Sequence, residues 1–257
     1  MDTTPSDPII KRLPYNIGSG VGERARIGLL VLESDQTIEE EFRLLTTLPG
    51  VSIYHARLEN GADVTTEMLS QMEEQIPKTA RLLPSYLGIK AIGYGCTSGS
   101  TVIGERRVDE ILSEAHKGVP STNPLSAAKA ALKIMGVKRL GLITPYSPNI
   151  TSVMQRNFNN ANLQVTIVGS YFEESDINVG RIDEDSIFNA VISIGESDKC
   201  DGVFISCTSL RAAKIIEKAE KAIDKPVTSS NQALAWHLLR LAGIKDTISG
   251  FGSLFSK

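Results

Sequence analysis

Short apolar runs alternate with longer amphipathic segments along most of the chain. Runs such as 26–32 and 202–206 are apolar almost without interruption, which is typical of strands buried on both faces of a parallel sheet. The predicted strands are 26–32, 51–56, 90–93, 139–143, 164–168, 202–206 and 226–228. The predicted helices are 37–48, 66–83, 96–116, 125–136, 149–160, 183–199, 210–222 and 231–241. Strands that alternate with helices predict an α/β fold with parallel sheets.

The order of these elements occurs twice, which predicts two pseudo-symmetric halves with one sheet each. We expect an N-terminal half at 1–124, completed by the C-terminal helical segment 232–257, and a C-terminal half at 125–231. Residues 1–23 are rich in proline and glycine and are expected to form an arm. Ligands of parallel α/β sheets bind beyond the carboxyl ends of the strands, so we expect the active site in a cleft between the halves. A single continuous sheet is the alternative architecture.

Composition and charge narrow the range of partners. The chain has 257 residues, is 41% hydrophobic and carries a net charge of -3, with no basic stripe. This argues against nucleic acid as a partner and favours a small molecule. No apolar run is long enough to span a membrane, and three cysteines without zinc-ligand spacing predict reduced thiols in the cytoplasm and no metal site. A homo-oligomer is compatible with these properties.

Two nearly identical tripeptides follow buried strands and carry the candidate chemistry. They are Cys96-Thr97-Ser98 and Cys207-Thr208-Ser209. Each is expected to open a helix, whose N-terminus attracts anions and lowers the pKa of a thiol below its usual value of about 8.5. Buried cysteines are often structural, but packing alone does not explain two matching turns in two similar halves. We therefore interpret Cys96 and Cys207 as functional and Cys200, which lies outside any such turn, as structural.

A thiol on each side of a substrate carbon suits proton transfer next to a carboxylate. One thiolate removes the proton and the other thiol returns a proton on the opposite face, which inverts the carbon without a cofactor. Hydroxyl and backbone N–H groups of the two turns would bind the carboxylate and the developing oxyanion. These groups belong to Thr97, Ser98, Thr208 and Ser209. The pattern predicts a cofactor-independent racemase or isomerase of a small carboxylate or amino acid.

Four segments, in their order along the chain, resemble the aspartate/glutamate racemase superfamily. They are YGCTSG at 94–99, LITPY at 142–146, SCTSLRA at 206–212 and PVTSSNQA at 226–233. Within the superfamily the chain is most similar to the branch of maleate cis–trans isomerases, arylmalonate decarboxylases and the racemase-like proteins of ectoine utilisation. The resemblance implies two pseudo-symmetric α/β halves, no metal, no organic cofactor, and a small carboxylate held between two catalytic positions.

The resemblance also implies roles for individual residues. Cys96 and Cys207 match the catalytic thiols, and Tyr146 matches a tyrosine whose hydroxyl binds a substrate carboxylate. The alternative for Tyr146 is a loop aromatic that caps the sheet. Of the two cysteines, arylmalonate decarboxylases are expected to have only the second, so the resemblance implies that the presence of Cys96 argues against simple decarboxylation. For a further substrate-side position the resemblance does not decide between Asp176 and Asn178.

Asp35 departs from the maleate isomerase pattern, in which an asparagine takes its place. A carboxylate there repels a dicarboxylate and attracts an ammonium group, which favours an amino acid as the substrate. Asp35 also lies just before the helix expected from residue 37, where aspartate is a good helix cap. The two roles do not exclude each other.

The main functional expectation is therefore a two-cysteine racemase or isomerase. The alternative is maleate-type cis–trans isomerisation, in which one thiolate adds to a double bond and the other thiol protonates the neighbouring carbon. An arylmalonate-type decarboxylase and a non-catalytic sensor of a metabolite are less favoured.

Overall fold

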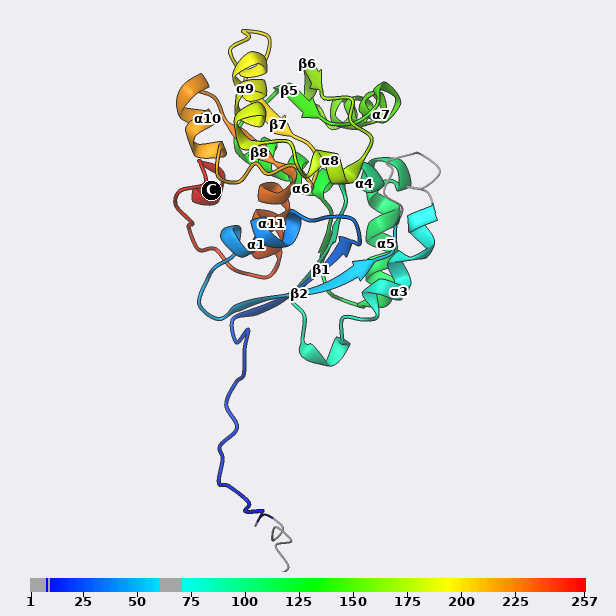
Figure 1. Ribbon diagram of the computed structural model, residues 1–257, viewed down its shortest axis with the longest axis vertical. Coiled ribbons are helices and arrows are strands. Elements are labelled where there is room, and N and C mark those ends of the chain that lie inside the picture. Colours follow the sequence, from blue (N-terminus) through cyan, green and yellow to red (C-terminus); the bar gives the residue numbers. More distant parts are fainter. Residues whose placement is uncertain (1–7, 9, 61–70) are drawn as a thin grey trace, which may run out of the picture.

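The computed structural model, which describes residues 8, 10–60 and 71–257, forms two parallel sheets of four strands each from these residues (Figure 1). The first sheet has the order β2–β1–β3–β4, and the second has the order β6–β5–β7–β8. The strands of the first sheet are β1 (Ala25–Leu32), β2 (Val51–Leu58), β3 (Ala91–Gly95) and β4 (Ser121–Thr122). Those of the second are β5 (Arg139–Thr144), β6 (Gln164–Ser170), β7 (Gly202–Ile205) and β8 (Val227–Ser229). The shared strand order confirms the α/β fold with two similar halves and excludes a single continuous sheet.

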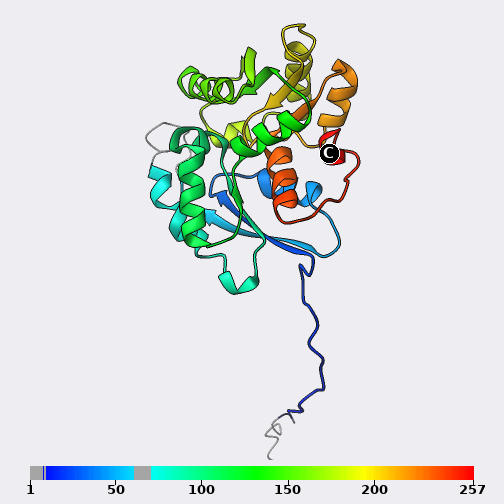
Figure 2. The same cartoon turned by 180° about the vertical axis from the view of Figure 1, so that it is seen from behind.

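Helices cover both faces of the sheets, as Figures 1 and 2 show from opposite sides. In the first half they are α1 (Ile38–Leu45), α3 (Ile76–Ala80), α4 (Thr97–Ile103) and α5 (Glu105–Ala115). In the remainder of the chain the helices are α6 (Pro124–Ile134), α7 (Pro148–Asn160), α8 (Asp176–Val179), α9 (Glu184–Gly195), α10 (Ile216–Ile223) and α11 (Ser230–Leu241). Short 3-10 turns lie at η1 (Met72–Glu74), η2 (Ser85–Leu87) and η3 (Leu254–Ser256). None of the helices described is long and apolar enough to cross a membrane.

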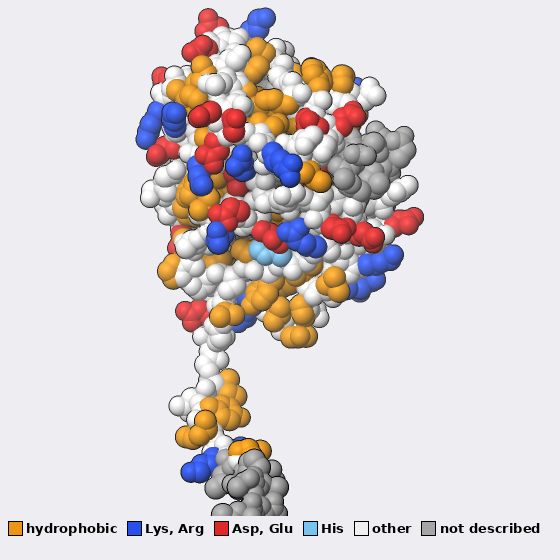
Figure 3. All heavy atoms as spheres, in the orientation of Figure 1, with side chains coloured by type: hydrophobic (Ala, Val, Ile, Leu, Met, Phe, Trp, Pro, Cys, Tyr) orange, Lys and Arg blue, Asp and Glu red, His pale blue; other side chains and the backbone are white. Residues whose placement is uncertain are grey.

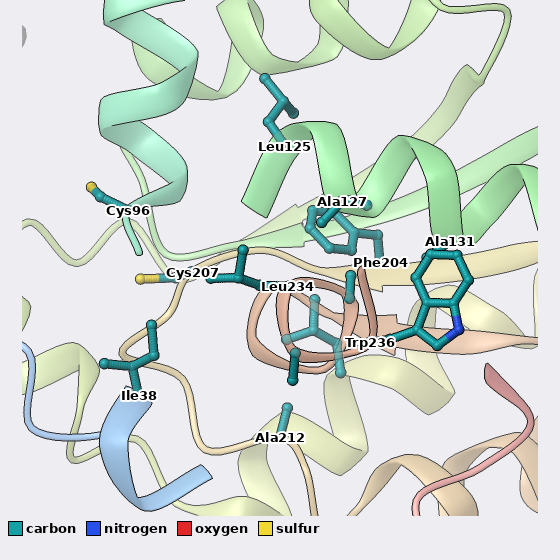
Figure 4. Close-up of a cluster of buried hydrophobic side chains, with 14 of the residues drawn as sticks. Ile38, Cys96, Leu125, Ala127, Ala131, Phe204, Cys207, Ala212, Leu234 and Trp236 are labelled. Atoms are coloured by element: carbon teal, nitrogen blue, oxygen red, sulfur yellow. The ribbon is translucent and has the colours of Figure 1, made fainter. Parts of the chain in front are cut away.

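Helix α11 lies at the centre of the molecule. It packs against β3 and β4 of the first sheet, against α1 and α6, and against β8 of the second sheet. A helix that contacts protein on several sides must be apolar over most of its surface, and α11 buries residues such as Leu234 and Trp236. Figure 4 shows these side chains in the same buried cluster as Phe204 of β7 and Leu125 of α6. The last helix therefore contacts elements of both halves and ends at Leu241, so most of the segment 232–257 is not helical.

Three predicted helices differ from the observed ones. The helix expected at 96–116 is divided into α4 and α5 at Gly104, whose φ is 96°. Of the helix expected at 66–83, residues 66–70 lie outside the described residues, and the remainder forms only η1 and α3. The helix expected at 210–222 begins only at Ile216, because the preceding segment forms turns instead.

Hydrogen bonds from distant residues explain the late start of α10. The carbonyl of Thr208 accepts a hydrogen bond from Asn231 Nδ2 (2.7 Å), and the carbonyl of Ser209 accepts one from Thr37 Oγ1 (2.9 Å). The N–H of Ala213 donates to Glu41 Oε1 (2.6 Å). Backbone groups that would form the first turn of a helix are thus bound to α1 and α11. Tertiary contacts override the local helical pattern here.

Glu41 is the charged residue at the centre of this contact. Its second oxygen accepts a hydrogen bond from Asn231 Nδ2 (2.8 Å), so one carboxylate joins α1, α11 and the segment after β7. The side chain is buried, and burial raises the pKa of Glu41 to about 7, although the hydrogen bonds from Ala213 and Asn231 oppose the shift. Together, the bonds made by Thr37, Glu41 and Asn231 hold the N-terminal end of α1, α11 and the segment after β7 in contact.

Glu41 makes the stability of the fold depend on pH. A carboxyl group whose pKa rises from 4.5 to about 7 on folding stabilises the fold fully below pH 4.5 and loses that contribution as the pH rises through 7. The size of the loss is about 3 kcal/mol. We expect the free energy of unfolding in urea to fall between pH 5 and pH 8, and the Glu41→Gln variant to lose most of this dependence. Glu40→Gln, at the exposed neighbouring residue, is the control, and an unchanged pH profile in Glu41→Gln would contradict the assignment.

Candidate active site

The two predicted thiols follow equivalent strands of the two sheets. Cys96 comes directly after β3 and Cys207 comes two residues after the end of β7, and both strands occupy the third position in their sheet. Figure 4 shows the two sulfur atoms pointing to the same side of the buried core. Burial raises the pKa of the Tyr146 hydroxyl well above its usual value, and ionised thiols at Cys96 and Cys207 would raise it further. The structure therefore brings Cys96, Cys207 and Tyr146 together.

Cys96 caps α4. Its Sγ accepts a hydrogen bond from the N–H of Gly99 (3.2 Å) and lies 3.6 Å from Ser98 Oγ. The expected lowering of the thiol pKa is nevertheless wrong. Burial raises the pKa of Cys96 to about 11, and the contacts with Ser98 Oγ and the N–H of Gly99 offset only part of this shift. The cost of removing a thiolate from water exceeds the stabilisation by the end of a helix of seven residues.

Cys207 does not begin a helix. The expectation that each tripeptide opens a helix is therefore wrong for Cys207-Thr208-Ser209. Cys207 lies in the turn segment before α10 and has a φ of 134°, where residues with a side chain are rare. Burial raises the pKa of its thiol well above the usual value, and the charge of Asp176 adds to this, whereas Tyr146 and the N–H of Ser209 lower it. The two tripeptides are alike in sequence but not in local structure.

Ser230 joins the two cysteine turns. Its Oγ accepts a hydrogen bond from Thr97 Oγ1 (2.8 Å) and another from the N–H of Cys207 (3.0 Å). Sequence reasoning quoted Ser230 within a motif but gave it no role. Its position as the first residue of α11, beside both turns, follows only from the tertiary fold.

The hydroxyl groups predicted to bind substrate are in part bound within the protein. Thr208 Oγ1 donates to the carbonyl of Gly95 (3.4 Å), and Ser209 Oγ donates to Asp176 Oδ1 (2.6 Å). Together with the bond from Thr97 to Ser230, these contacts fix the two turns against each other. Binding of a carboxylate by Thr97, Ser98, Thr208 and Ser209 stays a prediction.

Asp176 is a site residue that the sequence left undecided. It is the first residue of α8, is buried, and accepts hydrogen bonds from Ser34 Oγ (2.5 Å) and from Ser209 Oγ. Its charge contributes to the raised pKa of both Cys96 and Cys207. The other candidate, Asn178, is exposed. The acidic group beside the thiols is therefore Asp176.

Asp35 caps helix α1, which was one of its two expected roles. Its Oδ1 accepts hydrogen bonds from the N–H groups of Thr37 (2.7 Å) and Ile38 (2.9 Å). Its Oδ2 is buried beside Thr208 and has no hydrogen-bond partner of normal geometry among the described residues. Burial raises the pKa of Asp35 to about 6. One carboxylate oxygen thus serves the fold, and the other can bind a ligand.

Two tyrosine hydroxyls complete the surroundings of the thiols. Those of Tyr94 and Tyr146 are buried without a hydrogen bond of normal geometry within the described chain. Gly99 allows the approach of Tyr94, because a methyl group at Gly99 would collide with the Tyr94 hydroxyl and lie 3.0 Å from Cys96 Sγ. Buried polar groups are usually paired, so these hydroxyls are suited to hydrogen bonding with a substrate.

The remaining expectations concern metals and the third cysteine. Among the residues that the structure describes, no group of three or more histidine, cysteine or acidic side chains is arranged to bind a metal ion. Cys200 is buried, and its Sγ lies 3.4 Å from the carbonyl of Ile194, away from the two turns. This position agrees with a structural role.

The backbone at Cys207 predicts an unusual order of stabilities. Strain at such a φ costs roughly 1–3 kcal/mol, and glycine does not bear it. We expect Cys207→Gly to be more stable than Cys207→Ala by about 1 kcal/mol, the reverse of the usual order, in urea unfolding. Cys96, whose φ is -144°, is the matched control, and there the alanine variant should be the more stable one. An alanine variant that is more stable at both positions would show that Cys207 is unstrained.

Comparison with known proteins identifies the family. A family model described as arylmalonate decarboxylase matches residues 39–255. The maleate isomerase of Geobacillus stearothermophilus is 22% identical over 90% of this chain and 97% of its own length. The maleate cis–trans isomerase of Nocardia farcinica, solved as a cysteine-to-serine variant with a covalently bound succinylcysteine intermediate, is 22% identical and has a TM-score of 0.82 over 90% of this chain and 98% of its own. A liganded variant of arylmalonate decarboxylase, 25% identical, has a TM-score of 0.80 over the same shares.

These relatives support the expectation of an isomerase and the resemblance to the maleate isomerase and arylmalonate decarboxylase branch. The particular closeness to the proteins of ectoine utilisation stays a prediction. Because the family model covers most of the chain, this protein belongs to the arylmalonate decarboxylase family.

Proposed function

We propose that this protein is a cofactor-independent cis–trans isomerase of a small unsaturated carboxylate of the maleate type. The observation that carries the proposal is that two thiols follow equivalent strands of the two sheets and that their sulfur atoms point to the same side of the core (Figure 4). Relatives named maleate isomerase support this reaction over racemisation, which the sequence alone favoured. Cys96 argues against simple decarboxylation, for which one thiol is enough.

The two thiols differ in a way that suits two roles. The pKa of Cys96 is raised less than that of Cys207, and the N–H of Gly99 is in place to stabilise a thiolate on Cys96. Burial and the charge of Asp176 raise the pKa of both thiols, but Cys207 does not cap a helix whose N-terminus would oppose the shift. Cys96 is therefore the nucleophile, and Cys207 is the acid that protonates the substrate.

The reaction then runs through one covalent adduct. Cys96 first loses its proton to solvent. Its thiolate then adds to one alkene carbon, and the electron pair of the double bond moves to the neighbouring carbon, next to a carboxylate. Cys207 protonates that carbon, so the adduct is a saturated thioether whose central bond is free to rotate. After rotation, the Cys207 thiolate removes a proton from the same carbon, the double bond forms in the trans arrangement and the Cys96 thiolate leaves. No oxidant, reductant or added proton is consumed. The covalently bound succinylcysteine in the Nocardia farcinica neighbour is the kind of adduct that these reaction steps require.

The proposal predicts turnover of maleate that depends on both thiols. We expect proton NMR to show conversion of maleate to fumarate, and Cys96→Ser and Cys207→Ser each to reduce the rate by a factor of about 1,000 or more. Intact-mass spectrometry of Cys207→Ser with maleate should show the added mass of one maleate on Cys96, because the adduct cannot lose its proton efficiently. Cys200→Ser is the control and should keep its activity. Exchange of the alpha proton of an amino acid in D₂O without turnover of maleate would support racemisation instead, and tight binding without turnover would support a sensor.

Asp35 is expected to decide whether the enzyme prefers a carboxylate or an amide as the second polar group of its substrate. Its Oδ2, which has no hydrogen-bond partner of normal geometry among the described residues, repels a second carboxylate when ionised, whereas an asparagine amide would donate a hydrogen bond to that carboxylate. We expect Asp35→Asn to raise kcat/KM for maleate by roughly 10-fold or more relative to maleamate, whose amide group donates hydrogen bonds. Asparagine keeps the cap of α1, so the stability of the fold should change little. A variant that has normal stability but loses turnover of both substrates would show that the Asp35 carboxyl group itself is required.

A further inference from the structure

A second feature, independent of the thiol site, is an exposed apolar arm at residues 10–22. In Figure 1 this segment leaves the body at the start of β1, and Figure 3 shows hydrophobic side chains along it. Ile10, Leu13, Tyr15, Ile17 and Val21 have between 72% and 94% of their surface exposed. So many large apolar side chains in one short exposed segment indicate an interaction surface.

Hydrogen bonds at the base of the arm fix the direction in which the arm leaves the body. Arg26 of β1 donates to the carbonyl of Ser19 (3.1 Å) and to the carbonyl of Val21 (3.0 Å). Gly20 and Gly22 have φ values of 73° and 69°, which glycine adopts easily. These contacts direct the arm away from its own body, as both ribbon views show.

The arm has the pattern of an edge strand. Leu13, Tyr15 and Ile17 alternate with Pro14 and Asn16, so in an extended chain the three apolar side chains lie on one face. The N–H and C=O groups of the three apolar residues then point toward one neighbouring strand, and position 14 points to the opposite side. Proline is tolerated where no N–H bond is needed, which is the outer side of an edge strand.

The body of the protein offers a matching edge at β2. Within the described residues β2 pairs only with β1, so its other side is open. Val51, Ile53 and His55 alternate along β2 and line a groove of about 320 Å³ with residues of α1 and the turn after it. Among these, Phe42 and Thr46 form the floor that a neighbouring strand would cover. An open edge beside an apolar groove is the arrangement used for strand addition.

We propose that the arm of one copy of this chain adds as a strand to the β2 edge of a second copy, with Leu13, Tyr15 and Ile17 over the groove. The second copy places its own arm on the first in the same way, so a closed twofold dimer forms. Tyr15 lies opposite Ile53 whether the added strand is parallel or antiparallel, because both are the central residues of their three. The family model begins at residue 39, so the arm is a feature of this chain outside that match.

The oligomeric state of the full chain tests the proposal. We expect sedimentation velocity to show a dimer that dissociates on dilution, and a variant without residues 1–17 to be a monomer with unchanged circular dichroism. Ile53→Arg should also give a monomer, because the charge enters the groove. Leu82→Ser and Tyr86→Ser, at two other exposed apolar residues, are controls that should leave the dimer intact. A monomer at all concentrations, or a dimer that survives removal of the arm, would overturn the proposal.

Cross-linking separates exchange between copies from folding of the arm onto its own chain. Tyr15→Cys and Ile53→Cys are made in separate copies and mixed under mild oxidation. We expect a disulfide-linked heterodimer on a non-reducing gel, whereas neither variant alone should form it. If the disulfide forms only when both substitutions are in one chain, the arm covers its own β2 and the proposal is wrong.

Discussion

Buried hydrogen bonds between the carboxyl ends of the two sheets are the constraint on which the rest of the site depends. Polar groups that lose contact with water must be paired, and here the partners come from both halves. Glu41 and Asn231 bind the backbone after β7, and Ser230 binds both cysteine turns. Because these bonds use the backbone that would otherwise begin a helix, they also decide that Cys207 lies in a turn.

This constraint makes two similar motifs unequal. Cys96 remains at the start of α4 with the N–H of Gly99 on its sulfur, whereas Cys207 is held in an unfavourable backbone conformation with Tyr146 and Asp176 near it. Burial raises the pKa of both thiols, but only the sulfur of Cys96 accepts a hydrogen bond from a helix N-terminus. A nucleophile and an acid require such a difference, and identical surroundings would not supply it.

The sequence was sufficient for the features that depend on local pattern. Apolar runs predicted all the strands except the short β4, and the position of each cysteine after a strand predicted that the carboxyl ends of the sheets carry the site. The sequence did not predict the contacts between residues that are distant along the chain. Glu41 is one of three consecutive acidic residues with nothing in the sequence to distinguish it, and only the packing of α1 on α11 buries it. The direction of the thiol pKa shifts was wrong for the same reason, since a helix end is visible in sequence and the depth of burial is not.

The two halves share a strand order and carry one thiol each, and this has a consequence for how far the two thiols can differ. If each half were a separate copy of one short chain, the site would form across a twofold axis, and the symmetry would impose identical surroundings on both sulfur atoms. A single chain has no such requirement. Gly99 follows the first Cys-Thr-Ser tripeptide, whereas Leu210 takes the equivalent position after the second. Joining both halves in one polypeptide therefore allows the surroundings of each cysteine to be set independently.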